Sequence, residues 1–255
     1  MKDKKTLVSI ITVVFNGEKF IEETILSVLE QSYENIEYII IDGGSTDGTL
    51  DIIKKYEHKI KYFISEKDNG MYDAINKGLK RATGDIINFI NSDDTFYSNM
   101  TISHVVNAFK KDNLDCLYGG AVYIDGNGIQ FSDKKPLRYN ARYFKTLGMP
   151  CTQPSFFWKR TLMEDVGFLN LEYKIASDYD FIARLCLKAN KVGRVKKYLS
   201  KFRVFGESFG DRNTRLAMRE SQQIKDNLPG KVFFMFYLTD RIKQKLNQFM
   251  GGAYV

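Results

Sequence analysis

The sequence has very few cysteines and histidines, the residues that hold most structural zinc ions and disulfide frameworks. Its 255 residues contain three cysteines and two histidines. The cysteines are odd in number and far apart, so they form neither a zinc-binding spacing nor a disulfide framework, and they suit a reducing cytoplasm. Neither histidine has a nucleophile near it in sequence, so a Ser-His-Asp or Cys-His mechanism has little support. These residues are Cys116, Cys151, Cys186, His58 and His104.

The sequence also lacks a membrane-spanning run and the pattern of a secretory leader. The longest uninterrupted apolar segment, residues 232–238, has seven residues, whereas a spanning helix needs about 20. The first ten residues carry charge and lead straight into a strand-like run, without the apolar run and cleavage site of a signal peptide. We therefore expect a cytoplasmic protein, which could also sit peripherally on the inner face of a membrane.

The positive charge of the chain is concentrated near its C-terminal end. From residue 191 onward, fourteen Lys and Arg stand against five Asp and Glu, whereas residues 1–190 carry 24 and 26. Hydrophobic residues at 44% and charged residues at 27% are ordinary for a globular protein. A basic end on a near-neutral body indicates a polyanionic neighbour, either nucleic acid or an anionic membrane face, or simply a solvated basic surface.

The first 95 residues alternate between strand-like and helix-like segments. Apolar, β-branched runs are each followed by a turn and a helical pattern of apolar residues. Such alternation predicts parallel strands joined by crossover helices, which is a doubly wound α/β sheet. We expect strands at residues 7–15, 36–41, 60–64 and 85–90, and helices at 18–31, 50–56 and 71–82.

The alternation loosens after residue 94. We expect strands at 116–124 and 128–131, joined as a hairpin at Asp125-Gly126-Asn127, and another at 192–204. Helices are expected at residues 98–110, 176–189, 212–225 and 231–250.

Polar residues follow three of the predicted parallel strands. Ligands of doubly wound sheets bind at the carboxyl ends of the strands. This rule points to Phe15-Asn16, to Asp42 and to the segment Asn91-Ser92-Asp93-Asp94. The two adjacent carboxylates of the last segment repel each other unless a cation lies beside them. A divalent ion would remove this repulsion and could bridge two phosphates. The same residues are also typical of a turn that caps the next helix.

Two further carboxylates have a chemical and a structural interpretation. Asp42 ends the second strand and could accept the imide proton of a uracil ring, with Gly43 and Gly44 allowing close approach, or the segment is an ordinary turn. Asp178 and Asp180 stand at a helix start, where a carboxylate could take a proton from an attacking hydroxyl. Acids in a first turn also simply favour the helix dipole.

Taken together, residues 8–206 resemble the GT-A glycosyltransferases of family 2. Residues 9–49, SIITVVFNGEKFIEETILSVLEQSYENIEYIIIDGGSTDGT, resemble the first block of that family almost throughout. SEKDNGMYDAINKGL at 65–79 resembles its donor-site helix, most closely in members that build bacterial exopolysaccharide, capsule or O-antigen. FINSDD at 89–94 occupies the position of the metal-binding DxD motif, and ASDYDF at 176–181 that of the catalytic base.

The resemblance implies a GT-A fold, a Rossmann-like and mostly parallel sheet flanked by helices. It implies a glycosyltransferase domain at 1–206, with a nucleotide-binding half at 1–95 and an acceptor half at 96–206, and a basic C-terminal helical extension at 207–255. The implied enzyme is an inverting, metal-dependent transferase of the hexosyltransferase type with Mn²⁺ or Mg²⁺ as cofactor. Its donor would be a nucleotide diphosphate-sugar, with UDP favoured. Its acceptor would be a glycan or a lipid-diphosphate-linked glycan in surface polysaccharide synthesis.

The resemblance also assigns roles to individual residues. Asp178 would be the general base, Asp93 and Asp94 would hold the metal, and Asp42 would bind uracil. The other residues expected to bind the nucleotide-sugar are Phe15, Asn16, Asp68, Gly70, Asn76, Lys77, Asn91 and Ser92, and Gln153 is expected to contact the acceptor. A covalent, retaining mechanism would need a placed nucleophile, and none is assigned.

Three positions depart from the family pattern. Asn91 replaces the usual first Asp of DxD, so its amide could keep a ribose contact while the local charge falls. Gly43 replaces a second Asp that is common after the equivalent of Asp42. Ser177 replaces an acid that often precedes the base. The departures at Asn91 and Ser177 keep open a non-catalytic relative that only binds sugar nucleotides.

The chemistry of the site and the C-terminal segment each have a competing interpretation. A sugar nucleotidyltransferase should carry a Gly-rich, basic phosphate loop after the first strand, which residues 15–18 do not offer. A helix at 231–250 could lie on an anionic membrane with its apolar face down, or pack on its own domain or on a second subunit of a homodimer. Nucleic-acid binding is not expected, because the aromatic residues follow a core periodicity instead of forming a stacking face.

Overall fold

The computed structural model describes residues 5–139, 141–146, 148–206 and 213–229. Its strands are β1 (Val8–Val14), β2 (Ile36–Asp42), β3 (Tyr62–Ser65), β4 (Ile86–Asn91), β5 (Thr95–Phe96), β6 (Cys116–Ile124), β7 (Gln130–Lys134), β8 (Phe156–Lys159) and β9 (Val192–Arg203). Its α-helices are α1 (Ile21–Leu29), α2 (Thr49–Tyr56), α3 (Met71–Arg81), α4 (Thr101–Asp112), α5 (Ala141–Thr146), α6 (Arg160–Val166), α7 (Ser177–Lys188) and α9 (Thr214–Asn227). Two 3₁₀ helices are η1 (Glu57–Lys59) and η2 (Gln153–Ser155).

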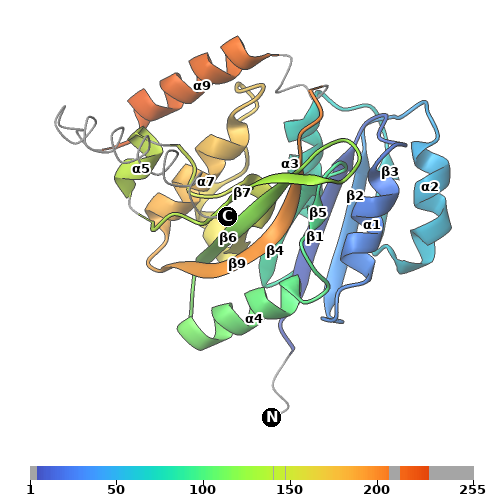
Figure 1. Ribbon diagram of the computed structural model, residues 1–255, viewed down its shortest axis with the longest axis horizontal. Helices are drawn as coiled ribbons and strands as arrows, with labels where there is room; N and C mark the ends of the chain where they lie inside the picture. Colours follow the sequence, from blue (N-terminus) through green and yellow to red (C-terminus); the bar gives the residue numbers. More distant parts are fainter. Residues whose placement is uncertain (1–4, 140, 147, 207–212, 230–255) are drawn as a thin grey trace.

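These strands form one sheet in the order β3-β2-β1-β4-β8-β6-β9-β5, with β7 paired to β6 beside this path. The neighbouring strands from β3 to β4 pair in parallel, as the alternation of strands and helices predicts. Helices lie on both faces of the sheet (Figure 1). The predicted doubly wound α/β arrangement is therefore confirmed.

Both faces of the parallel strands are buried. In β1, Ile11 and Val13 belong to a core shared with α3 and α7. The alternate residues Val8 and Ile10 belong to a second core shared with α1, α2 and α4. Burying one such side chain contributes roughly 1.5–3 kcal/mol. The two cores thus explain the near-continuous apolar runs of these strands and fix the loops at their ends.

Helix α3 lies unusually close to the sheet at Gly78. A Cβ atom at this position would stand 2.4 Å from the Cγ2 atom of Ile11, closer than real Cβ contacts allow. Glycine therefore sets the distance between α3 and β1 and, with it, the place of the start of α3 above the strand ends.

The second half of the sheet mixes strand directions. β8 lies antiparallel between β4 and β6, and β9 is parallel to β6. The predicted hairpin of β6 and β7 is confirmed, and the Asp125 carboxylate closes its turn by accepting the backbone N–H groups of Asn127 and Ile129. β8 and α6 were not predicted, because four and seven residues are too short to show a period.

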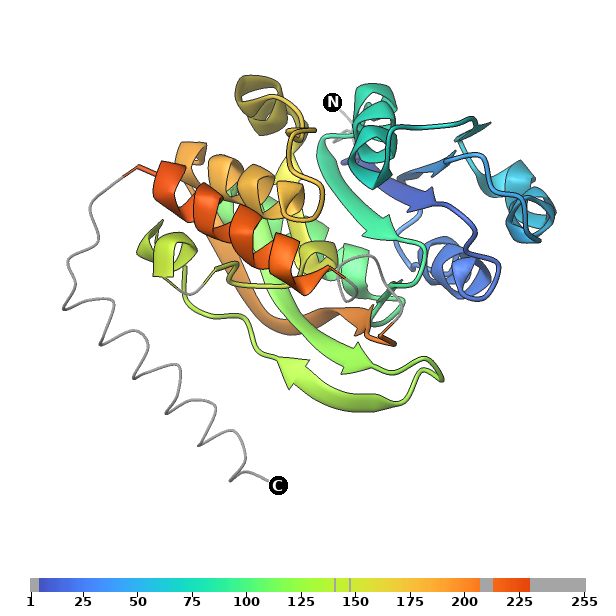
Figure 2. The same ribbon diagram turned by 90° about the horizontal axis from the view of Figure 1, so that it is seen from above.

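Helix α9 packs against α5 and α7 on one side of the molecule (Figures 1 and 2). Its buried residue Ile224 joins the core that contains α7. The helix predicted at residues 231–250, and with it the membrane and dimer interpretations, lies outside the described residues. No helix within the described part of the chain has the length and hydropathy needed to cross a membrane.

Candidate active site

Three of the polar segments singled out in the sequence meet at one edge of the sheet. Val14 pairs with Asp42 across β1 and β2, and Val13 pairs with Asn91 across β1 and β4. Because these strands are parallel and in register, their carboxyl ends lie side by side. Residues 15–16, Asp42 and residues 91–94 therefore follow three adjacent strands, as predicted from the strand-end rule.

Asp42 is a fully buried carboxylate that organises its own loop. Its oxygens accept the backbone N–H groups of Gly44 at 3.0 Å and Ser45 at 2.9 Å, and the hydroxyls of Ser45 at 2.5 Å and Ser65 at 2.6 Å. Four hydrogen bonds fill most of the acceptor capacity of a carboxylate. The Asp42 carboxylate thus holds the backbone of its own loop in place. Direct contact of Asp42 with a nucleotide base stays a prediction.

The exposed surface beside Asp42 is formed by three other segments. Gly43 approaches Asp68 so closely that a Cβ atom at Gly43 would stand 2.5 Å from the Asp68 Oδ2 atom and 3.5 Å from the Phe15 Cβ atom. The Phe15 side chain is 63% exposed at the end of β1, so its ring is available for stacking with a flat ligand. A side chain at position 43 would require the Asp68 carboxylate to move.

Asn16 joins the first loop to the second. Its backbone has a positive φ of 50°, a conformation that Asn adopts more readily than most residues. Its N–H donates to the Ser45 hydroxyl at 2.7 Å, and its side-chain oxygen accepts the N–H of Thr46 at 2.8 Å. Asn16 therefore shapes the predicted nucleotide pocket through the loop that follows β2.

The predicted residues in α3 and just before it have different surroundings. Asp68 accepts the N–H of Gly70, whose φ is 107°. Lys77 pairs with Glu66 at 2.8 Å, which raises the pKa of the lysine. Asn76 is buried instead, and its amide makes two hydrogen bonds with the backbone of Leu169. Its position predicts a structural role, between the donor-side helix and the loop before α7.

The two carboxyl groups of the acidic turn, residues 91–94, differ in their burial. Asp93 is half-buried, whereas Asp94 is buried and accepts the backbone N–H of Arg203 at 2.9 Å. Burial, together with the neighbouring charge of Asp93, raises the pKa of Asp94 well above its usual range. Ser92 lies against Gly17, and its carbonyl accepts the Thr24 hydroxyl at 2.9 Å. Asp93 is therefore the better placed of the two to meet a ligand.

The buried Arg203 side chain holds this turn in place through hydrogen bonds. Arg203 was not predicted as a site residue. It is 3% exposed, and its Nε atom donates to the Asp93 carbonyl at 2.9 Å. Its other guanidinium nitrogens contact the Glu23 carboxylate and the Asp125 carbonyl, at 2.5 and 3.1 Å. In the sequence Arg203 is one of many basic residues in the C-terminal part. Only the pairing of β9 with β5 and β6 brings it to the acidic turn.

The residues at this turn could hold a divalent cation together with a ligand. No group of three His, Cys, Asp or Glu side chains able to hold a metal occurs among the described residues. A Mg²⁺ site of one or two carboxylates completed by substrate phosphates and water needs no such group. The Asn91 Oδ1 atom is buried and has no hydrogen-bond partner in the described part of the chain. An oxygen donor is thus present beside Asp93.

Asp178 stands in the first turn of α7, next to helix α3. The Tyr72 hydroxyl of α3 contacts the Asp178 Oδ1 atom at 3.2 Å and the Ile175 carbonyl. Burial raises the pKa of Asp178 to about 6, although the Tyr72 hydroxyl and the Tyr179 N–H favour the charged form. A carboxylate with this pKa is charged at neutral pH and is a stronger base than an ordinary aspartate.

These contacts connect the predicted base to the nucleotide loops. Gly43 lies against Asp68, Asp68 bonds Gly70, and Tyr72 in the next turn reaches Asp178. Asp178 also lines a pocket of about 380 Å³ whose other walls come from residues 148–149 and from α9. The structure thus brings the regions of Asp42 and Asp178 to one side of the molecule. Asp180, two residues further along, pairs instead with Arg184 at 2.8 Å.

Gln153 and Ser177 are both buried beside these segments. The Gln153 amide donates to the Phe89 carbonyl of β4 at 2.6 Å, while its Oε1 atom is buried without a hydrogen-bond partner in the described residues. The Ser177 hydroxyl donates to the Asn170 carbonyl at 2.7 Å. Gln153 therefore supports the end of β4, and contact with an acceptor stays a prediction.

Comparison with known proteins gives consistent results. The profile described as "Glycosyl transferase family 2" matches residues 9–167, more than half of the chain. An uncharacterized glycosyltransferase of Mycobacterium tuberculosis is 32% identical over 189 residues, which are 72% of this chain and 71% of that protein. One of Haemophilus influenzae is 39% identical over 127 residues, 49% of this chain and 50% of its own length.

Solved structures share the fold at low identity. Staphylococcus aureus TarS 1–349 in complex with UDP-GlcNAc superposes with a TM-score of 0.68 at 21% identity, covering 88% of this chain and 68% of TarS 1–349. The mannosyltransferase PcManGT of Pyrobaculum calidifontis, in complex with GDP-Man and Mn²⁺, gives 0.66 at 17% identity, covering 91% of this chain and 67% of its own. The predicted GT-A fold is therefore confirmed.

Proposed function

This chain belongs to glycosyl transferase family 2, and from that premise we propose that it transfers a sugar from a nucleotide diphosphate-sugar with inversion at the anomeric carbon. One observation carries the proposal. The Tyr72 hydroxyl, on the helix next to the nucleotide loops, meets the Asp178 carboxylate, whose pKa is raised to about 6. This contact supports the proposal, because a single displacement requires the base to lie beside the donor pocket.

The donor side is the surface formed by the loops after β1, β2 and β4. Phe15 offers an exposed ring for the base of the nucleotide, and the Asp42 loop shapes the pocket beside it. Asp68 and Gly70 lie just before α3 and Lys77 lies within it, near the proposed ribose and diphosphate. UDP is the favoured nucleotide, and the complexes of TarS with UDP-GlcNAc and UDP support this choice.

In the proposed reaction, Asp178 removes the proton of the acceptor hydroxyl. The oxygen then attacks the anomeric carbon as the bond to the diphosphate breaks, so the configuration inverts in one step. Burial of Asp178 makes its carboxylate more basic, and the Tyr72 hydroxyl orients one of its oxygens. General-base catalysis of this kind contributes about 10²- to 10⁴-fold to the rate.

We propose Mn²⁺ or Mg²⁺ as the cofactor. Asp93 would hold it, with the Asn91 oxygen next to it and Asp94 behind, and Arg203 fixes the backbone of this turn. When bound, a divalent ion would offset the negative charge that grows on the departing diphosphate. The presence of Mn²⁺ in the PcManGT complex supports this assignment.

The acceptor is proposed to be a glycan, free or linked to a lipid diphosphate, in the synthesis of a surface polysaccharide. The pocket at Asp178 is bounded by α9, and we propose that a saccharide acceptor enters it to present its hydroxyl to Asp178. The division of the chain into a domain at 1–206 and an extension from 207 is likewise a proposal. Helix α9 packs on α7, so the first part of that extension contributes to the same face.

A donor screen tests the proposal. The protein would be incubated with nucleotide-sugars and candidate glycan acceptors, with Mn²⁺, Mg²⁺ or a chelator, and the released nucleoside diphosphate would be measured. We expect one donor to be preferred, activity to require the metal, and NMR of the product to show an inverted anomeric configuration.

Two variants assign the base. Asp178→Asn should lower transfer by about 10³-fold while calorimetry finds unchanged UDP affinity. Asp180→Asn, which removes the same charge from the same helix, should keep activity because Asp180 pairs with Arg184 away from Tyr72. Full activity of Asp178→Asn would refute the assignment. UDP binding by the wild type, without turnover of any donor, would favour a non-catalytic sugar-nucleotide binder.

A further inference from the structure

Helix α9 supplies a buried carboxylate to the segment that precedes Asp178. Glu220, 7% exposed, accepts three consecutive backbone N–H groups. Its Oε1 atom accepts that of Lys174 at 2.8 Å, and its Oε2 atom accepts those of Ile175 at 2.9 Å and Ala176 at 3.0 Å. Successive N–H groups that converge in this way form an anion-binding concavity. Here the anion is a side chain 44–46 residues further along the chain.

The same backbone is held on its other side by α3. The Tyr72 hydroxyl contacts the Ile175 carbonyl, and the Asn76 amide bonds the backbone of Leu169. Asp178 follows directly after this doubly fastened segment, in the first turn of α7. Its carboxylate position therefore depends on two helices that are remote from each other in sequence.

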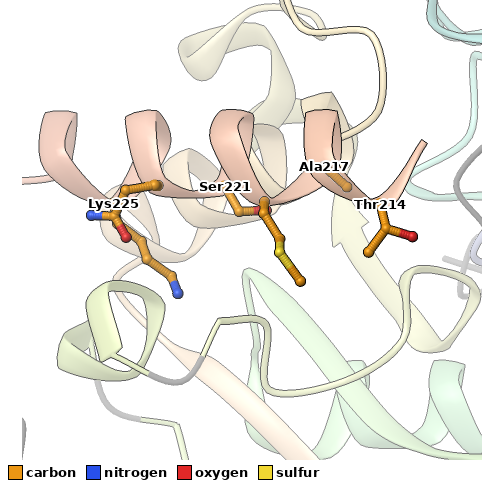
Figure 3. Close-up of a pocket in the computed structure, with 6 residues that line it drawn as sticks. Thr214, Ala217, Ser221 and Lys225 are labelled. Carbon is orange, nitrogen blue, oxygen red and sulfur yellow. The ribbon is translucent and has the colours of Figure 1, made fainter.

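Helix α9 also forms a wall of the pocket that contains Asp178. Ala217, Ser221 and Lys225 line that pocket and continue into a neighbouring groove of about 340 Å³ along the helix. Figure 3 shows these side chains on the face of α9 that is turned toward the groove. Glu220 is next to this stripe, so one helix both bounds the pocket and holds the backbone of the base.

We propose that Glu220 is a positioning residue for the Asp178 carboxylate, which makes α9 part of the active site although it lies beyond residues 9–167 matched by the family profile. This inference rests on the proposed role of Asp178 as general base. A glutamine at position 220 keeps the side-chain length but replaces one acceptor oxygen by an NH₂ group, which cannot accept an N–H. At least one of the three hydrogen bonds is then lost, and the segment before Asp178 can shift.

The first test compares Glu220→Gln with Asp226→Asn, which removes an exposed carboxylate from the same helix. We expect Glu220→Gln to lower kcat by about 10- to 100-fold, because small displacements of a reacting group have effects of this size. The KM for the donor and the affinity for UDP should not change. Asp226→Asn should behave as wild type. Assays are run well below the melting temperature of each variant, so that only folded protein is compared.

The pH profile gives a second readout. Ionisable groups around the pocket are Tyr72 from α3, Tyr179 from α7, Cys151 and Lys225 from α9, with the Glu220 carboxylate on the backbone that leads to Asp178. Removing the negative charge of Glu220 favours the charged form of a nearby carboxylate. The acidic limb of kcat, near pH 6 in the wild type, should move to lower pH in Glu220→Gln. A loss of stability alone would leave the limb in place.

A double-mutant cycle separates this inference from the proposed function. If Glu220 acts through Asp178, Glu220→Gln should cause no further loss in the Asp178→Asn background. Additive losses, or equal activity of Glu220→Gln and Asp226→Asn, would overturn the positioning role while leaving the base assignment intact. If instead Asp178→Asn is fully active, the proposed function itself fails.

Discussion

Asp42 and Asp178 lie on the same side of the molecule but are held in opposite ways. The Asp42 carboxylate accepts three hydrogen bonds from Gly44 and Ser45 and a fourth from Ser65 on the adjacent strand. Asp178 receives its side-chain hydrogen bond from Tyr72, 106 residues away. The proposed nucleotide side of the site is thus built largely within one loop, whereas the proposed base side is assembled from remote helices.

This difference predicts that substitutions elsewhere in the molecule affect the Asp42 loop and the Asp178 carboxylate to different degrees. A loop whose hydrogen bonds are local keeps its shape when the rest of the molecule changes. A carboxylate held by α3 and, as we propose, through α9 changes its position and basicity when either helix is altered. The acidic turn is intermediate, because it follows β4 directly but is fastened by Arg203.

The largest effect is expected from Asp42→Ala. It leaves the buried N–H groups of Gly44 and Ser45 without their acceptor, so the free energy of unfolding should fall by about 3 kcal/mol. UDP affinity should fall beyond detection, because the loop that forms the proposed pocket loses the hydrogen bonds that hold it in place. Urea denaturation and calorimetry measure the two effects, with Asp51→Ala on the exposed face of α2 as control. Retained UDP binding would show that the loop does not depend on its local hydrogen bonds.

Arg203→Met tests whether the acidic turn depends on remote contacts, as Asp178 does, or on local ones, as Asp42 does. The substitution keeps much of the side-chain volume and removes the hydrogen bonds to the Asp93 and Asp125 carbonyls and the ion pair with Glu23. Because the Glu23 side chain is 58% exposed, the expected loss is moderate, about 2 kcal/mol of unfolding free energy. Stimulation of donor turnover by Mn²⁺ should also weaken. The exposed control Lys196→Met should change neither quantity, and an unchanged metal response in Arg203→Met would place the turn with the locally held loops.

Tyr72→Phe should affect the base side alone. Loss of the hydroxyl removes a hydrogen bond that favours the charged form of Asp178, so the pKa of Asp178 should rise. The acidic limb of kcat then moves to higher pH, opposite to the shift expected for Glu220→Gln, and kcat at its optimum falls by about 10-fold. UDP affinity should be unchanged, as in the control Tyr62→Phe. A shift in the same direction for both variants would contradict the opposed roles.

The smallest effect concerns stability. The folded-state pKa of Asp178, about 6, lies above its ordinary value of 3.8. The folded protein therefore keeps a proton that the unfolded chain releases, and this contribution to stability is lost as the pH rises from about 4 to about 6. Asp178→Asn should consequently melt a few degrees higher than wild type at pH 7 and show no gain at pH 4. Equal melting temperatures at pH 7 would mean that burial of the charged Asp178 carboxylate does not lower the stability of the protein.

Most of the nucleotide half could be predicted from the sequence. The strands β1, β2 and β4, the helix α3 and the meeting of residues 15–16, 42 and 91–94 all follow from periodicity and the rules of parallel sheets. The order of the remaining strands could not be predicted, because β8 and β5 have only four and two residues. The burial of Asn76 and Gln153 was equally hidden, since their partners, Leu169 and Phe89, are 93 and 64 residues away.

The sequence by itself determined the doubly wound sheet, the family resemblance and the residues that crowd its strand ends, because these depend on short-range periodicity and on contiguous motifs. The tertiary structure alone decided which carboxylate is buried, which is partly exposed and which side chains hold each of them in place. Arg203 and Glu220 are inconspicuous in the sequence, and their contacts with residues 93–94 and 174–176 form only because β9 and α9 pack beside these segments. Hydrogen bonds between residues so far apart leave no local pattern, so only the folded chain reveals them.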